Sequence, residues 1–136
     1  MAIKTENQIE RDFYSMIRES DLGKSIRGGI YRSGMRPYDS KGEDLIVKFL
    51  SGLDEQVQTG IVIVNIYVPD IADRQGRRLV DHQRIGELQD LLSSFINSND
   101  DTEYWIRSDS TPTTMENKEI EQHFIYSRIK FNRITI

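Results

Sequence analysis

The stretch Gly60-Ile-Val-Ile-Val-Asn-Ile-Tyr-Val-Pro69 decides the fold of this chain. Successive side chains of a β-strand point to opposite faces of its sheet. One face of this strand would carry four aliphatic side chains: Val62, Val64, Ile66 and Val68. The opposite face would carry Ile61, Ile63 and Tyr67, interrupted only by Asn65. Because both faces are apolar, we expect a central strand whose faces are each covered by helices or by another subunit.

Length and composition limit the class of protein. The chain has 136 residues, of which 37% are hydrophobic and 29% charged, as expected for a single globular domain spanning residues 1–136. The net charge of −4 argues against general binding to nucleic acid. The absence of cysteine excludes disulfides and thiolate metal sites. No signal-peptide core or membrane-length apolar run is present, so we expect a soluble cytoplasmic protein without a cofactor.

The first third of the chain predicts one helix and one short strand. Apolar residues at helical spacing predict a helix over residues 5–20, with Thr5 as its N-cap and Gly23 as a stop signal soon after. Ile26, Ile30 and Tyr31 suggest a short strand, and the intervening glycines Gly28 and Gly29 predict a bulge or a close backbone approach. Residues 35–42 should form a loop.

The central strand is expected to belong to a long β-hairpin. Residues 45–51 would pair with residues 55–68 across a turn at 51–54, and Pro69 would end the second strand. Leu53 is unusually apolar for a turn, so it would either make a contact at the hairpin tip or fold back.

The second half predicts a helix followed by two strands. After a polar connection at residues 70–76, apolar residues at helical spacing predict a helix over 77–97. Residues 103–107 read as a strand, 108–117 as a mobile polar loop, and 120–136 as a long final strand whose alternation shifts near Arg133. The order α-β-β-β-α-β-β predicts an α+β fold with a mainly antiparallel sheet and two main helices packed on it.

The sequence lacks a catalytic signature. Gly23-Lys24-Ser25 resembles the end of a phosphate-binding loop, but Arg18 occupies the position of the required earlier glycine. The two histidines, His82 and His123, have no partner at metal-ligand spacing, so we expect neither a metal site nor an enzyme. An enzyme whose site combines distant residues, such as His82 or His123 with Asp70, is the last alternative.

Several residues suggest contacts between subunits. Arginines near the start of the second helix oppose its dipole, which suggests intersubunit ion pairs, although a solvated loop would also explain them. Tyr104 and Trp105 are adjacent, so one should be core and the other could anchor a contact. Seven acids between residues 97 and 121 precede a basic final strand, which would let copies attract head to tail or would simply be solvated. The candidate subunit interface comprises Leu53, Ile61, Ile63, Tyr67, Asp70, Arg74, Arg77, Arg78, Trp105, Arg128 and Lys130.

The order of elements resembles that of the tail-completion or tail-terminator proteins of tailed bacteriophages and prophages. The resemblance lies in the N-terminal helix leading into Ile26-Arg-Gly-Gly-Ile-Tyr31, the strand pair 45–50 and 61–68 ending in Pro69-Asp70, and the helix 77–97 before paired C-terminal strands. It covers most of the chain as an arrangement of elements and includes no diagnostic residue motif. The extension of the hairpin over residues 51–59 departs from the family pattern.

The resemblance implies a non-enzymatic α+β subunit of the phage tail or neck. Such proteins form rings, often hexamers, that terminate the tail tube and join it to the head, with DNA passing through the lumen. Partners would be further copies, tail-tube proteins and head-connector proteins, and the location would be the host cytoplasm during assembly and the virion neck afterwards. A small monomeric module that binds a protein or peptide through the strand of Trp105 or the loop 108–117 is the main alternative.

Overall fold

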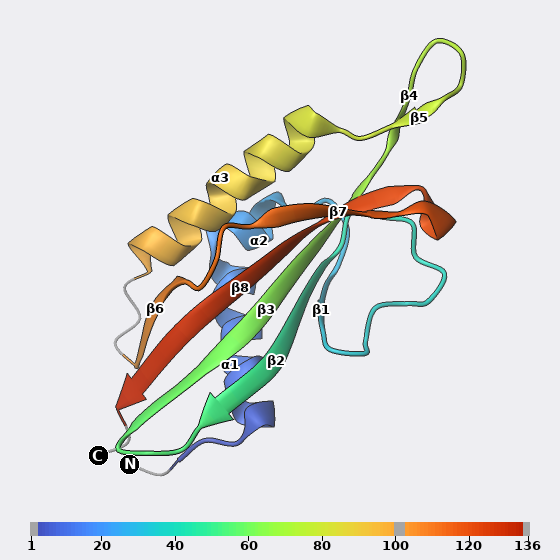
Figure 1. Cartoon of the computed structure of the whole chain (residues 1–136). Coiled ribbons are helices and arrows are strands. Elements are labelled where there is room, and N and C mark those ends of the chain that lie inside the picture. Colours follow the sequence, from blue (N-terminus) through green and yellow to red (C-terminus); the bar gives the residue numbers. More distant parts are fainter. Residues whose placement is uncertain (1–2, 100–102, 135–136) are drawn as a thin grey trace.

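The computed structural model describes residues 3–99 and 103–134. Figure 1 shows helices lying across a strongly twisted sheet, with a short two-stranded ribbon projecting from one end. The elements in chain order are α1 (Glu6–Glu19), α2 (Asp21–Ser25), β1 (Ile30–Arg32), β2 (Leu45–Leu53), β3 (Val57–Pro69), β4 (Ile71–Ala72), β5 (Arg78–Leu79), α3 (His82–Ser98), β6 (Tyr104–Ser108), β7 (Thr113–Asn117), a 3₁₀ turn η1 (Lys118–Ile120) and β8 (Gln122–Ile134).

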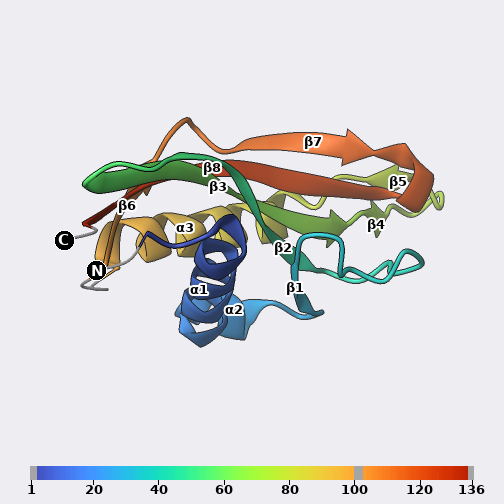
Figure 2. The same ribbon diagram turned by 90° about the horizontal axis from the view of Figure 1, so that it is seen from below.

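The main sheet has six strands in the order β1-β2-β3-β8-β6, and β7 pairs with β8 beside that path. Every pairing is antiparallel except the one between β1 and β2. β6 lies along the C-terminal half of β8 and β7 along its N-terminal half, so both occupy the same edge. Figure 2 shows all the labelled α-helices on one side of this sheet. The predicted α+β fold with a mainly antiparallel sheet is therefore confirmed.

The core lies between the helices and the Val62 face of β3. Val62, Val64 and Ile66 are completely buried there. Phe13 of α1 packs against Phe131 of β8, with ring centroids 5.7 Å apart. Burying each large apolar side chain contributes about 1.5–3 kcal/mol, so this layer supplies most of the stabilisation. The helices contribute the following buried apolar residues to it: Ile9, Phe13, Ile17, Leu22, Ile85, Leu88, Leu92, Phe95 and Ile96.

The predicted long hairpin is confirmed as β2 and β3. Val47 pairs with Val64, and the register shifts between Phe49 and Ser51. Leu53, which we expected in the turn, lies instead on β2 opposite Thr59. β2 therefore continues two residues further than predicted, because the backbone of Gly52 and Leu53 still pairs with β3.

The N-terminal segments follow their local signals closely. Thr5 caps α1 in a capping box, accepting a hydrogen bond from the Gln8 amide (3.3 Å) while its own amide donates to Gln8 Oε1 (2.9 Å). The close approach predicted at Gly28 is confirmed, because a Cβ there would lie 2.3 Å from the carbonyl oxygen of Glu43. Gly23 does not stop a helix, however. It is buried inside α2, and Ser20 both ends α1 and caps α2.

Three predictions for the second half were wrong. The helix expected over 77–97 begins only at His82, because Asp81 is its N-cap and residues 78–79 form β5. The loop expected over 108–117 contains β7, whose polar residues become a strand by pairing with β8. The alternation of β8 does not shift at Arg133, because this arginine is buried on the same face as Phe131. The predicted order of elements therefore lacked α2, β4, β5 and β7.

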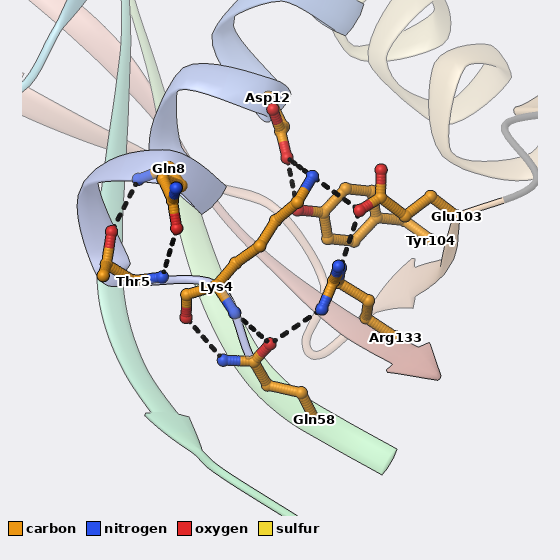
Figure 3. A network of polar contacts seen from close by, with 8 residues as sticks. All are labelled: Lys4, Thr5, Gln8, Asp12, Gln58, Glu103, Tyr104 and Arg133. Carbon is orange, nitrogen blue, oxygen red and sulfur yellow. Dashed lines mark hydrogen bonds and ion pairs between the residues drawn. The ribbon is translucent and has the colours of Figure 1, made fainter. Parts of the chain in front are cut away.

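Arg133 is tolerated in the core because a polar cluster surrounds it (Figure 3). Its Nε donates to Glu103 Oε2 at 2.6 Å, and the same carboxylate pairs with Lys4. Lys4 also binds Asp12, which accepts a hydrogen bond from the hydroxyl of Tyr104 at 2.7 Å. Burial opposes both charges, yet these contacts raise the pKa of Lys4 and lower that of Glu103. The cluster therefore fixes α1 to the C-terminal end of β8.

Candidate functional site

No described helix covers the sheet face opposite the core, which we call the outer face (Figure 2). Residues directly opposite one another in a ladder share a face. Ile61 and Ile63 of β3 lie on the outer face, opposite Lys130 and Arg128 of β8. Ile63 is nevertheless only 7% exposed, whereas Ile61 is half-buried. On the outer face of the central strand, neighbouring residues thus shield Ile63, whereas Ile61 is partly exposed.

The predicted interface residue Tyr67 is covered within the same chain. The guanidinium of Arg36 lies 4.0 Å from the centroid of its ring, from the loop that follows β1. Arg36 also donates to Asp44 Oδ2 (2.9 Å) and to Gln122 Oε1 (3.0 Å). This loop therefore closes the outer face at the Pro69 end of β3. Burial opposes ionisation of Asp44, but hydrogen bonds from Ser40, Gly29 and Arg36 keep its pKa below the usual value.

The other end of the outer face carries an exposed apolar cluster, which we call the terminal patch. It consists of Leu53, Val57, Trp105 and Ile134. One row across the sheet runs from Leu53 through Thr59 and Asn132 to Trp105, and Val57 and Ile134 are paired beside it. Trp105 is 61% exposed and Leu53 58%. Large apolar groups gathered on one surface are typical of a protein contact.

A basic row adjoins the terminal patch on the outer face. Lys130 of β8 lies between Ile61 of β3 and Arg107 of β6, and Ile63 of β3 lies between Lys48 of β2 and Arg128 of β8. The row thus contains four basic residues: Lys48, Arg107, Arg128 and Lys130. In the described part of the chain only Arg128 among them forms an ion pair, with Asp109 at 3.0 Å. The outer face therefore combines exposed apolar groups with an excess of positive charge, although the whole chain is acidic.

A projecting ribbon, which we call the arm, carries three of the predicted interface residues, Arg74, Arg77 and Arg78, and a fourth, Asp70, immediately precedes it. It comprises β4, β5 and the turn between them, and Figure 1 shows it pointing away from the sheet and α3. Asp73 stabilises the turn by accepting hydrogen bonds from the amides of Gln75 and Arg77. Arg78 anchors the base through Glu121 at 3.1 Å. Ile71 and Leu79 are paired across the arm yet remain 49% and 36% exposed.

The fold brings Asp70 and His123 together, as the enzyme alternative required. Asp70 Oδ1 lies 2.6 Å from His123 Nδ1, and Glu116 is 3.9 Å from the other ring nitrogen. His82, in contrast, is exposed at the start of α3. Asp70 also lines a cleft of about 380 Å³ between the start of α3 and the end of β3. A histidine held by a carboxylate can transfer a proton, so this pair has the arrangement of a general base.

The two buried charged groups of this cleft, Glu43 and Arg84, are bound to each other. Glu43 and Arg84 are 5% and 7% exposed, and Arg84 donates to both carboxylate oxygens, at 2.9 and 2.8 Å. Arg84 also donates to the carbonyl of Ser25 at 2.7 Å, which ties α3 to the end of α2. The hydrogen bond to Glu43 is the main reason that the pKa of Arg84 is raised. This arrangement joins three segments of the chain and leaves its polar groups satisfied.

The comparisons with known proteins do not assign the chain to a family. No family model matches it, and no curated protein matches it significantly. Among the described residues no cluster of histidine, cysteine and carboxylate side chains could hold a metal ion. None of the described helices has the length and apolar character needed to cross a membrane.

The structure gathers most predicted interface residues into two places. Leu53, Ile61, Trp105, Arg128 and Lys130 lie together on the outer face, and Arg74, Arg77 and Arg78 lie on the arm. Tyr67 is covered by Arg36 of the loop after β1. Sequence reasoning missed Val57, Ile134, Lys48 and Arg107, although the period-two pattern of each strand would have placed them on the outer face once the register was known.

Proposed function

We propose that this chain is a structural subunit that assembles into a ring at a phage or prophage tail or neck. The observation that carries the proposal is the terminal patch on a sheet face that no described helix covers. Exposed aromatic and aliphatic groups rimmed by charge are typical of protein interfaces. The resemblance in element order to tail-terminator proteins supplies the particular role, namely ending the tail tube and joining it to the head.

The proposed ring is often a hexamer in proteins of this kind, and DNA would pass through its lumen. The basic row would bind phosphates if it lined that lumen. We therefore place the row against protein, either a neighbouring copy or a tail-tube or head-connector protein. Assembly would occur in the cytoplasm of the host cell, and the mature location would be the neck of the virion.

Mass measurement over a range of concentrations tests the proposal. Light scattering or native mass spectrometry should show one closed oligomer whose population rises with protein concentration. Trp105→Thr removes the largest side chain of the terminal patch. Removing an aromatic side chain from an interface typically costs about 2 kcal/mol of association free energy, which would raise the dissociation constant roughly 30-fold. The matched control is Tyr38→Thr, because Tyr38 is 98% exposed on a loop outside the patch.

A strict monomer at every concentration, with no assembly on adding tail tubes, would refute the ring. Far-UV circular dichroism of both variants would confirm that they remain folded. Equal weakening by Trp105→Thr and Tyr38→Thr would show that the terminal patch is not the contact.

The second candidate is a monomeric module that binds one protein or peptide. It is favoured by the position of Trp105 on β6, whose other edge is unpaired within the described residues. An extended peptide can add to such an edge strand while the aromatic group provides an anchor. A stable monomer whose peptide binding depends on the exposed Trp105 side chain would support this function over the ring.

A further inference from the structure

We propose that the arm of one copy inserts into a groove between α1, α2 and α3 of the next copy. This inference rests on the proposed ring and specifies how its subunits are joined. The arm has an apolar pair, Ile71 and Leu79, next to three arginines. The groove has an apolar floor with an acidic rim, so its chemistry is complementary to that of the arm.

The groove lies where α1 passes into α2, opposite the C-terminal half of α3. Its volume is about 630 Å³, within the range of cavities that enclose compact groups. Its apolar lining comprises Met16, Leu22, Leu91 and Phe95. Glu19 and Asp21 are its charged lining residues, and both are exposed. A groove of this composition favours a partner that is apolar and cationic.

The end of α3 adds to the negative potential of the groove. Its C-terminus lies beside the groove at Asn99, and its last turn contains no basic residue. A helix C-terminus carries a partial negative charge. The end of α1 at Ser20 does not add to this potential, because Arg18 lies in its last turn and α2 begins at the same residue. An arginine entering from another copy would therefore be stabilised by two carboxylates and by the end of α3.

The arm has a physical need for a partner surface. A ribbon of two strands is at best marginally stable alone, and this one has only two paired positions on each strand. Arg77 and Arg78 are held by Asp73 and Glu121, whereas Arg74 at the tip makes no ion pair with any described residue. Insertion would bury Ile71 and Leu79 and would give Arg74 a carboxylate partner.

The arm cannot reach the groove of its own chain. From His82, just after the arm, to Phe95 in the groove, α3 advances about 20 Å at 1.5 Å per residue. The arm extends only about 10 Å from Ile71 to Arg74, and it points away from α3 (Figure 1). Insertion must therefore occur between copies. The contact joins two different surfaces, which is the kind of contact that closes a ring.

Cysteine cross-linking tests the contact directly, because the native chain has no cysteine. Ala72→Cys places a thiol on the arm and Ser94→Cys places one in the groove, and both positions are exposed. The two single variants are mixed and treated with a short bismaleimide. The expected result is a cross-linked pair that contains one copy of each variant. Ser110→Cys, on an exposed loop away from the groove, is the matched control for Ser94→Cys.

Charge reversal provides a second readout that does not depend on cross-linking. Arg74→Glu would place like charges together and raise the dissociation constant about tenfold or more. Adding Glu19→Arg to the same chain should restore assembly by recreating an opposite-charge pair. Glu87→Arg on the exposed side of α3, outside the groove, should not restore it.

The outcomes separate this contact from the ring itself. A closed ring without specific cross-linking between positions 72 and 94, and without rescue, would overturn the arm contact and leave the ring. A dimer or open chain that cross-links at this pair would support the contact and contradict the closed ring. A monomer without cross-linking would refute both.

Discussion

Replacing Arg84 with methionine should strongly destabilise the fold, since it leaves the buried carboxylate of Glu43 without its partner. Glu43 is only 5% exposed, and Arg84 binds both of its oxygens at 2.9 and 2.8 Å. Breaking a buried ion pair from one side typically costs about 3–5 kcal/mol. The change also removes the hydrogen bond to the carbonyl of Ser25. We therefore expect Arg84→Met to remove about 3–5 kcal/mol of the free energy of unfolding.

Urea unfolding followed by far-UV circular dichroism measures this loss. With a slope of roughly 1.5–2 kcal/mol per molar urea, the midpoint should fall by about 2 M. Measurement on the Trp105→Thr background keeps assembly from adding to the apparent stability. Arg77→Met is the matched control, because the Arg77 side chain is 70% exposed and its ion pair with Asp73 should contribute less than about 1 kcal/mol.

The double variant Arg84→Met with Glu43→Gln tests whether the unpaired charge of Glu43 causes the loss. It removes both charges and should recover much of the loss, since replacing a buried ion pair as a unit is often close to neutral. A cost for Arg84→Met no greater than that for Arg77→Met would refute the structural role. If the variant also kept its fold but lost a measured turnover, the cleft would have to be reconsidered as an active site.

Two further perturbations follow from the described contacts. In the folded protein the pKa values of Asp44 and Glu103 lie below their ordinary values of 3.8 and 4.5. The two carboxylates therefore stabilise the fold fully above these ordinary values, and this stabilisation is lost as the pH falls through their lower pKa values in the folded state. The urea midpoint should therefore drop steeply below about pH 4, and Asp44→Asn should flatten that drop. Gly60→Ala should destabilise by about 1–3 kcal/mol, because its Cβ would meet the Ser51 carbonyl at 2.4 Å and the Phe131 ring at 2.7 Å. Gly86→Ala, in α3 with open space around it, should instead stabilise by up to about 1 kcal/mol, and thermal unfolding of the two variants compares them directly.

Periodicity predicted the elements that bury a continuous apolar surface. β3, α1 and the apolar part of α3 carry strong patterns of period 2 or 3.6, and each was placed correctly in type. β7 has no such pattern, because Thr113–Asn117 becomes a strand only by pairing with β8. β4 and β5 are likewise defined by each other and by the Asp73 turn. β7 is hidden by its polar composition, and β4 and β5 are too short to show a period of their own.

The buried charges were invisible for a related reason. Arg133, Arg84 and Glu43 resemble surface residues in the sequence, and each is buried only because its partner arrives from a distant segment. Arg84 and Glu43 are 41 positions apart. Strand parity groups Ile61 with Ile63 on one face of β3 from the sequence alone, but the register and the helix positions are needed to show that this face lies opposite the core. Coverage of Tyr67 by Arg36 depends on a loop conformation that no periodicity encodes.

The distribution of charge on the two sides of the sheet bears on how copies would associate in the proposed ring. Lys48, Arg107, Arg128 and Lys130 make the outer face basic, whereas the exposed charged residues of α3, on the other side of the sheet, are the acids Glu87 and Asp90. Pairing two outer faces would place like charges together, which opposes association. Placing the outer face of one copy against α3 of the next would pair opposite charges. That contact would use two different surfaces, and contacts of this kind close into a ring when the rotation between copies permits it. The basic arm and the acidic groove are likewise two different surfaces of opposite charge, which is why we favour a ring over a symmetric dimer.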